Sequence, residues 1–161
     1  LHEKDTVVEF ARPGMKIDLG GIAKGYALDC AVKKLKENNI KSCLINAGGQ
    51  VYGLGDKFGK SWQVAIRGAK QPEISGTLAL RNQSASTSGN YEQFFLKAGK
   101  RYCHIIDPRT GYPADTDITS VTVIAASAME ADALSTSIFV LGKNNSQGLL
   151  DKFPEVKTRI Y

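Results

Sequence analysis

Residues 127–141 read SAMEADALSTSIFVL, and this stretch predicts a helix that decides how the rest of the chain is interpreted. Ser127 and Glu130 have the spacing of a capping box, so the helix should begin directly after the serine. Asp132 and Thr136 then lie on one helix face among mostly apolar neighbours. A carboxylate in such a run is costly to desolvate unless it is paired, and a hard cation with oxygen ligands is one suitable partner. The alternative is a solvent-facing or helix-capping aspartate followed by an ordinary threonine.

Residues 15–27, MKIDLGGIAKGYA, predict a strand that ends at Asp18, a glycine turn, and a helix that runs to about Asn38. The bare backbone of the glycine turn permits close approach of a ligand. A helix N-terminus beside such a turn suits an anionic phosphate, which Lys24 could reach from the first helical turn. A tight strand-to-helix turn with a solvated lysine explains the same residues without a ligand.

Residues 104–111, HIIDPRTG, predict a shaped loop that follows a strand. Pro108 fixes its own backbone and restricts Asp107, and Gly111 ends the turn. His104 stands at the mouth of this loop, where an imidazole could move protons near neutral pH. A structural histidine beside common turn chemistry is the alternative.

Five ordered motifs together resemble the ApbE family of FAD:protein FMN transferases. They are Asp18–Ala27, Asn46–Gly49, Ser86–Gly89, His104–Gly111 and Glu130–Thr136. Their order and approximate spacing are those of the family, and the resemblance extends from about Val7 to Phe153. It implies a T-fold-related ApbE-like core and a magnesium-dependent enzyme. Such an enzyme splits the pyrophosphate of FAD and passes FMN to a threonine hydroxyl of a target protein, with release of AMP.

The resemblance also implies a metal site for Mg²⁺. The metal-ligand positions of the family match Asp132, Thr136, the adjacent Ser135 and, through its backbone carbonyl, Gly21. One carboxylate, one or two hydroxyls and a carbonyl, completed by water and substrate phosphate, suit the oxygen preference of this ion.

Other residues are implied to contact the flavin nucleotide or to act in catalysis. The nucleotide-binding positions match Asp18, Lys24 and Ile105. His104 matches the histidine proposed to act in catalysis, where it would deprotonate the incoming threonine hydroxyl, or water in its place. Asn46, Gly48 and Gly49 belong to a family motif near the active site, with their individual contacts left open. The segment Ser86–Gly89 should lie at the same cleft.

Members of this family carry an N-terminal segment that supplies part of the FAD pocket, and the present sequence begins after it. We expect residues 1–161 to form a single ApbE-like domain that is a fragment, a natural short form, or one part of a two-chain assembly. Two other functions stay open: a magnesium-dependent FAD pyrophosphatase that yields FMN and AMP, and a non-catalytic flavin-binding fragment. The expected partners are FAD, an acceptor flavoprotein that carries the target threonine, and, as a candidate, a second copy of the chain in a homodimer.

The chain has 161 residues, of which 42% are hydrophobic, enough for one domain with a proper core. Its net charge of +5 comes with scattered lysines, densest at Lys33, Lys34 and Lys36 on the expected surface of the first helix. No nucleic-acid-binding signature accompanies them, so we expect no nucleic acid among the partners. The sequence contains no apolar run of membrane-spanning length and no recognisable signal peptide. An extracytoplasmic, lipoprotein-type location is therefore implied by the resemblance alone.

The three cysteines have neither CxxC nor zinc-finger spacing, and their odd number argues against a disulfide framework. Cys30 follows the helical phase of Ile22 and Tyr26, and Cys43 lies in an apolar strand. Both are therefore expected in the core.

An α+β fold is expected, with a mainly antiparallel sheet and two or three helices, because several connections, such as residues 98–100, are short enough for hairpins. Helices are predicted at residues 22–38, 128–141 and 146–153. Strands are predicted at residues 6–10, 42–46, 50–54, 62–66, 76–82, 91–96, 104–106, 118–125 and 156–161.

Overall fold

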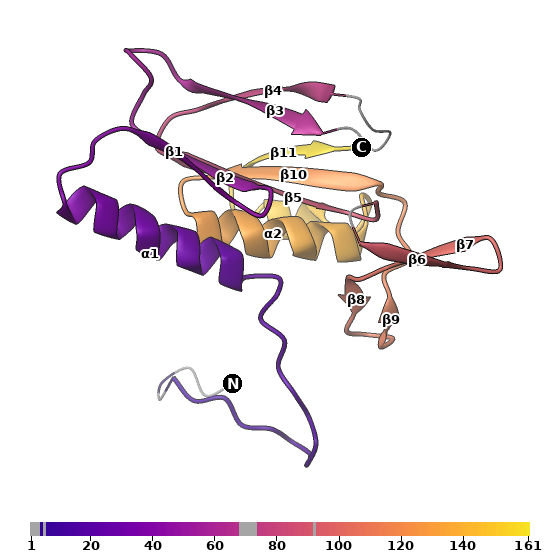
Figure 1. Ribbon diagram of the computed structural model, residues 1–161. Coiled ribbons are helices and arrows are strands. Elements are labelled where there is room, and N and C mark those ends of the chain that lie inside the picture. Colours follow the sequence, from indigo (N-terminus) through magenta and orange to yellow (C-terminus); the bar gives the residue numbers. More distant parts are fainter. Residues whose placement is uncertain (1–3, 5, 68–73, 92) are drawn as a thin grey trace.

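A five-stranded antiparallel sheet forms the centre of the computed structural model, which describes residues 4, 6–67, 74–91 and 93–161 (Figure 1). The strands lie in the order β1-β2-β5-β10-β11, so neighbours in the sheet come from distant parts of the chain. Their bounds are Cys43–Ala47, Gln50–Leu54, Gln83–Gly89, Ser120–Ala125 and Lys157–Ile160. The middle pair, β5 and β10, stays in register over the whole of β10, which joins the early and late halves of the sequence.

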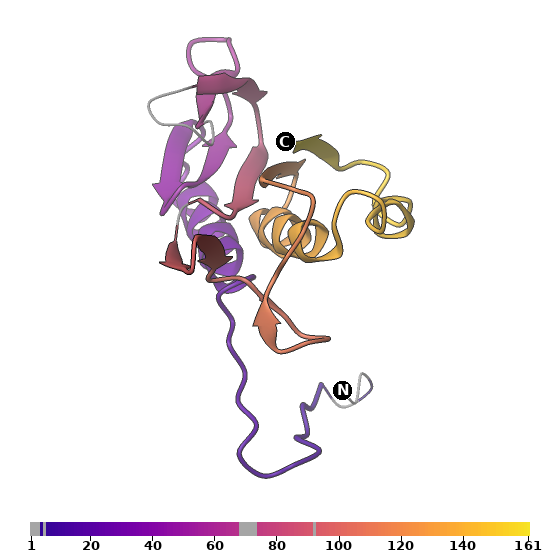
Figure 2. The same cartoon turned by 90° about the vertical axis from the view of Figure 1, so that its right-hand side faces the viewer.

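Two long helices, α1 (Ala23–Glu37) and α2 (Ala128–Leu141), cover one face of this sheet. The hairpin of β3 (Trp62–Arg67) and β4 (Ile74–Leu80) lies over the other face (Figure 1). Smaller elements complete the fold: β6 (Phe94–Lys97), β7 (Lys100–Cys103), β8 (Ile106–Asp107), β9 (Tyr112–Pro113) and α3 (Gln147–Leu150). The segment that leads into α1 runs away from the body in both views (Figures 1 and 2).

The apolar core lies on both faces of the sheet. Alternate residues of β10 point in opposite directions, so Val121, Val123 and Ala125 pack against α2 while Ile124 faces the β3–β4 hairpin. All six residues of β10 are buried, as expected for a strand covered on both faces. Burial of this strand fixes the position of α2, which begins only three residues after it.

The two long helices approach each other closely at Gly25. A Cβ atom added to Gly25 would lie only 2.3 Å from the carbonyl oxygen of Ala128, so a larger residue cannot pack there without a shift of the backbone. Four residues further along α1, the carboxylate of Asp29 accepts hydrogen bonds from Ser127 Oγ at 2.7 Å and from the backbone N–H groups of Ala128 and Met129 at 2.8 and 3.0 Å. These donors are unpaired at a helix N-terminus, so Asp29 caps α2 from α1.

The predicted α+β class, the antiparallel character of the sheet and the two long helices are confirmed. The predicted start of α2 at Ser127 is also confirmed, since Ser127 Oγ accepts a hydrogen bond from the N–H of Glu130 at 3.2 Å and so caps the helix. Lys33, Lys34 and Lys36 are exposed, as predicted. No helix in the described part of the chain is long and apolar enough to cross a membrane.

Four structural predictions are wrong. Residues 6–10 form no named strand but lie exposed in the segment before α1. The strand predicted to end at Asp18 is absent too, since residues 15–18 lie exposed in the same segment. Residues 83–89, for which no strand was predicted, form the central strand β5, because their polar side chains are satisfied by α2. Cys30 is exposed, since Gly25, Leu28 and Val32 form the buried face of α1, whereas the side of Tyr26 faces outward with 61% of the residue exposed. Cys43 is partly buried, and burial raises the pKa of its thiol above 9.0.

Candidate functional site

A cleft of about 680 Å³ lies where the start of α1, the β1–β2 turn, β5 and the exposed side of α2 meet residues 104–108. Predicted site residues from four separate motifs line it: Asp18, Gly21, Lys24, Gly48, Gly49, His104, Ile105, Asp132 and Thr136. The structure therefore brings together most of the side chains that the sequence marked as candidates.

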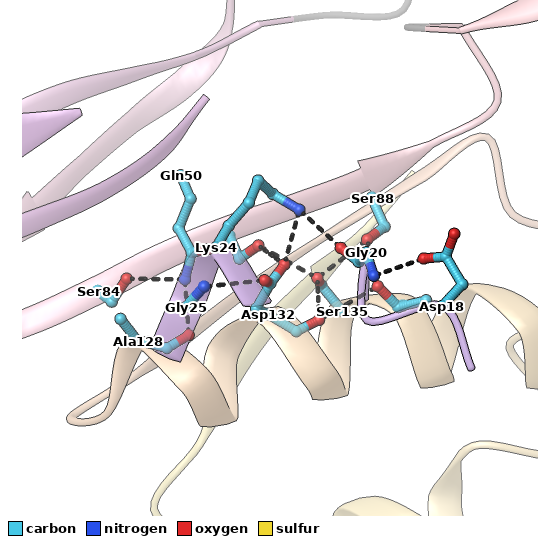
Figure 3. A network of polar contacts seen from close by, with 12 residues as sticks. Asp18, Gly20, Lys24, Gly25, Gln50, Ser84, Ser88, Ala128, Asp132 and Ser135 are labelled. Atoms are coloured by element: carbon cyan, nitrogen blue, oxygen red, sulfur yellow. Dashed lines mark hydrogen bonds and ion pairs between the residues drawn. The ribbon is translucent and has the colours of Figure 1, made fainter. Parts of the chain in front are cut away.

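Asp132 is the buried charge at the base of this cleft, with only 1% of the residue exposed. Its Oδ2 atom accepts a hydrogen bond from the backbone N–H of Gly25 at 3.0 Å, across the close contact between the two helices (Figure 3). Its Oδ1 atom lies 3.2 Å from Lys24 Nζ and accepts a longer hydrogen bond from Ser86 Oγ at 3.4 Å. A buried carboxylate is stable only with such partners, and here one oxygen is bound to backbone while the other faces movable groups.

A row of serine hydroxyls on β5 faces α2. Ser84, Ser86 and Ser88 alternate along the strand and therefore share one face. Ser88 Oγ lies 3.0 Å from Ser135 Oγ and 3.4 Å from Thr136 Oγ1. The row supplies neutral oxygen atoms beside the Asp132 carboxylate, which is the chemistry a hard cation requires.

Ser135 and Thr136 differ in their access to the cleft. Thr136 lines it, and its hydroxyl donates to the carbonyl of Asp132 at 3.2 Å. Ser135 is fully buried, and its hydroxyl bonds the carbonyl of Asp132 at 3.0 Å and Ser86 Oγ at 3.3 Å. The metal contact predicted for Ser135 stays a prediction, while its observed contacts position Asp132 and the serine row.

The backbone of Gly21 lies against Thr136, because an added Cβ would come within 3.3 Å of Thr136 Cγ2. Among the described residues, no backbone N–H donates to the Gly21 carbonyl, since the N–H of Gly25, one helical turn later, donates to Asp132 instead. An unused carbonyl thus lies near a carboxylate and a hydroxyl. This donor set fits Mg²⁺, and the described residues offer no cluster of three His, Cys, Asp or Glu that would suit a softer ion.

The start of α1 is suited to bind an anion. Asp18 Oδ1 accepts the N–H of Gly20 at 2.6 Å and so shapes the turn, while α1 itself has no side-chain cap and no acidic residue in its first turn. Lys24 Nζ, half exposed, lies 3.1 Å from the carbonyl of Gly20. The helix dipole and one ammonium group together favour a phosphate here, while the N–H groups of Ala23 and Gly25 are already bonded to Leu19 and Asp132.

His104 is exposed at the cleft and is held by the backbone of Gln93. The Nδ1 atom of His104 lies 3.1 Å from the Gln93 carbonyl, which also accepts the backbone N–H of His104 at 3.1 Å. A carbonyl only accepts, so the neutral imidazole must carry its proton on Nδ1 and leave Nε2 as a base. Ile105, which is buried, follows it and contributes an apolar wall.

The loop after His104 is fixed by Asp107 and Arg109. Asp107 Oδ1 accepts Arg109 Nε at 2.9 Å, and Asp107 Oδ2 accepts Arg109 Nη2 at 2.7 Å. Hydrogen bonds from the side chain and the backbone of Arg109 lower the pKa of the Asp107 carboxyl below its ordinary 3.8. Arg109 Nη2 also donates to the carbonyl of Val140 at 3.3 Å, which ties this loop to the end of α2.

The turn between β1 and β2 forms another wall of the cleft. Gly48 and Gly49 both have positive φ, at 58° and 92°, and Asn46 Oδ1 accepts the N–H of Gly49 at 3.0 Å. Asn46 faces a neighbouring cavity rather than the cleft, although both glycines line both spaces. Gln50, just after the turn, donates from Nε2 to the carbonyl of Ala128 at 2.6 Å, and its buried Oε1 has no partner among the described residues.

The model of the ApbE family matches residues 1–160, almost the whole chain. The chain belongs to the ApbE family. A FAD:protein FMN transferase of Treponema pallidum is 42% identical to it over 162 residues, which cover 92% of this chain and 44% of that protein. A FAD:protein FMN transferase of Klebsiella pneumoniae is 40% identical and covers 88% of this chain and 44% of its own length. The chain thus spans about half the length of the curated relatives it matches.

Solved ApbE structures have the same fold. The ApbE protein of Thermotoga maritima superimposes with a TM-score of 0.83 at 40% identity, covering 92% of this chain and 49% of that one. The flavin transferase ApbE of Vibrio cholerae superimposes with a TM-score of 0.78 at 29% identity, covering 92% of this chain and 47% of that one. The ApbE-like core expected from the sequence is confirmed.

Sequence reasoning missed four residues that shape this ApbE site: Gly25, Asp29, Gln50 and Ser84. Gly25 and Asp29 lay inside a predicted helix, where nothing local shows that they contact a second helix more than 95 residues later. The serine row was detectable, since Ser84, Ser86 and Ser88 alternate as a half-buried strand requires.

Proposed function

We propose that this chain carries the catalytic centre for magnesium-dependent transfer of FMN from FAD to a threonine hydroxyl of an acceptor flavoprotein. In the balanced step, the threonine oxygen bonds to the FMN phosphorus, the bond to the AMP phosphate breaks, and AMP leaves. The observation that carries the proposal is the meeting of Asp132, Lys24 and the hydroxyl row with His104 in one cleft. The relatives' names support transfer of FMN from FAD to a protein.

The oxygen donors supply the metal part of this proposal. The Asp132 carboxylate, the Thr136 hydroxyl and the Gly21 carbonyl would hold Mg²⁺, which when bound neutralises pyrophosphate charge and orients the leaving group. Lys24 and the N-terminus of α1 would bind the phosphates beside it. The chain's own contribution is mainly position and charge.

His104 is assigned the proton transfer. With Nδ1 bound to the Gln93 carbonyl, Nε2 is the atom that would take the proton from the threonine hydroxyl. Ile105, Gly48 and Gly49 would form the walls that seat the flavin nucleotide, and Asp18 would keep the glycine turn in shape.

The test measures AMP release from FAD, with and without Mg²⁺, and FMN attached to a threonine-containing acceptor peptide by mass spectrometry. Wild type should release AMP and label the peptide only with the metal, and Asp132→Asn should do neither. The matched control is Asp151→Asn, because Asp151 is an exposed aspartate at the end of α3 whose side chain accepts a hydrogen bond only from Gln147 among the described residues. It should retain both activities.

Two results would contradict the transferase. AMP release with an unlabelled peptide would make the chain a pyrophosphatase, and retained FAD without AMP release would make it a flavin binder. Circular dichroism on each variant establishes that the fold is intact.

Two further expectations complete the proposal. We propose an extracytoplasmic site of action on the basis of the family resemblance, to be tested by fractionation of cells that express the native gene. Homodimer formation stays a prediction, to be tested by sedimentation equilibrium.

A further inference from the structure

Lys24 lies in the position of a cation between two oxygen donors. Its Nζ atom is 3.2 Å from Asp132 Oδ1 and 3.1 Å from the carbonyl of Gly20 (Figure 3). The two partners differ in access to solvent, since the side chain of Lys24 is 47% exposed and that of Asp132 only 2%. The ammonium group therefore approaches the buried carboxylate from the cleft side, the side from which any dissolved cation would also arrive.

We propose that Lys24 is an exchangeable internal cation that a divalent metal ion must displace from Asp132 Oδ1, and that the displaced ammonium group then serves the phosphate site at the start of α1. The proposal rests on the metal site of the proposed function. It gives Lys24 a positioning role toward the metal, in addition to contact with the nucleotide.

The Lys24 ammonium group and a metal ion cannot both contact Asp132 Oδ1 without strong repulsion, because the carboxylate is buried. The remaining partners of Asp132 are too few to replace Lys24, because Gly25 N–H binds only Oδ2 and Ser86 reaches Oδ1 at a long 3.4 Å. Without either cation, the buried carboxylate would be poorly compensated. Lys24 thus stabilises the site but competes with the metal ion that the chemistry needs.

The geometry also provides a place for the displaced group. Lys24 lies in the first turn of α1, where the positive end of the helix dipole is not offset by any acidic residue of that turn. Its long flexible side chain can move from Asp132 to an anion held there without a change in the backbone. Metal and phosphate should then assist each other's binding through Lys24 as well as by direct contact.

The experiment titrates Mg²⁺ into the metal-free protein and measures its affinity by calorimetry. Lys24→Met removes the competing charge and keeps the apolar stem, so Mg²⁺ should bind about tenfold more tightly, equivalent to about 1.4 kcal/mol. The matched control is Lys34→Met on the same helix, which removes a lysine that pairs at 2.8 Å with the exposed Glu37 and should leave the affinity unchanged. In EDTA, Lys24→Met should unfold at a lower urea concentration than wild type. Addition of Mg²⁺ should raise the urea midpoint of Lys24→Met by more than it raises that of wild type.

Three outcomes overturn the exchange. Equal or weaker Mg²⁺ binding by Lys24→Met than by wild type would reject it while leaving the metal site intact. Absence of binding in wild type and variant alike, with both folded, would reject the exchange and the metal part of the proposed function together. If Lys24→Met does not fold, NMR of the lysine side chains in wild type is the deciding measurement. Mg²⁺ must then shift the signals of Lys24 and leave those of Lys34 in place. Unshifted Lys24 signals in the metal-bound protein refute the proposal.

Discussion

Substitution of Gly25 by alanine should damage both stability and the site, against the usual preference for alanine in helices. The added methyl group would lie 2.3 Å from the carbonyl oxygen of Ala128 and 2.5 Å from the Cα atom of Met129, the first two residues of α2. Restoring ordinary contact requires the backbones to separate by about 1 Å. Overpacking of this kind costs about 1–3 kcal/mol or more, and the helix propensity gained is only about 1 kcal/mol. Because the clash is with backbone atoms, the cost should lie at the upper end of that range, which leaves a net loss of about 2 kcal/mol.

Urea unfolding followed by circular dichroism measures this loss as a lower midpoint with an unchanged slope. Gly148→Ala is the matched control, because Gly148 lies in α3 with no atom within 4 Å of an added Cβ, and it should be neutral or slightly stabilising. Separation of the helices should also break the Gly25–Asp132 hydrogen bond and weaken Mg²⁺ binding. A Gly25→Ala protein as stable as wild type, with unchanged metal affinity, would refute the reasoning.

Three further predictions concern pH, catalysis and thiol reactivity. Arg109 lowers the pKa of the Asp107 carboxyl from 3.8, so this pair stabilises the folded protein above that pH. The stabilisation is lost as the pH falls through the lower pKa of the folded state. Asp107→Asn should therefore remove this part of the acid dependence of stability, measured by urea unfolding from pH 6 to about pH 2. His104→Ala should lower turnover about 10²–10⁴-fold with the unfolding midpoint unchanged, since His104 is exposed; unchanged turnover would end its role as base. In native protein, DTNB should react first at Cys30, which is exposed, and last at Cys103, which is buried, and peptide mapping that finds Cys103 modified first would contradict the packing of β7.

The sequence predicted the long helices and the hairpins because their signals are local. The capping box at Ser127 and Glu130 lies within four residues, and the Ala98–Gly99 turn between β6 and β7 carries two positive φ angles, as a tight hairpin turn requires. Such features need no knowledge of the rest of the chain. They fix where an element begins or ends, and the structure agrees within a few residues.

The central strand β5 was missed for a physical reason. QSASTSG has neither β-branched nor aromatic residues apart from Thr87, so its local preference for a strand is weak. Its stability comes from pairing with β2 and β10 on both sides and from the hydroxyl groups that meet α2. A strand whose residues supply polar oxygen atoms rather than apolar packing is typical of a functional site, where the requirements of function override local strand preference.

The orientation of α1 was misjudged for a related reason. The apolar residues Ile22, Tyr26 and Cys30 suggested the buried face, yet the structure buries the face of Gly25 and Leu28. Hydrophobic periodicity records the size of apolar side chains and cannot reveal a face that is buried because it is small. Close contact at Gly25 brings its N–H group to Asp132, a benefit that only the tertiary structure shows.

The same close contact explains how the site can exchange one cation for another without losing its shape. Gly25 N–H fixes Oδ2 of Asp132, and Asp29 fixes the N-terminus of the helix that carries it. Both anchors are hydrogen bonds within the chain and involve no dissolved ion, so the carboxylate stays in place whether Lys24 or a metal ion lies at Oδ1. The negative charge of Asp29 also reaches Tyr52, because burial of the tyrosine and then the charge of Asp29 raise the pKa of the Tyr52 hydroxyl above 10.0. Rigid anchoring of one oxygen is what lets the other serve as an exchangeable ligand.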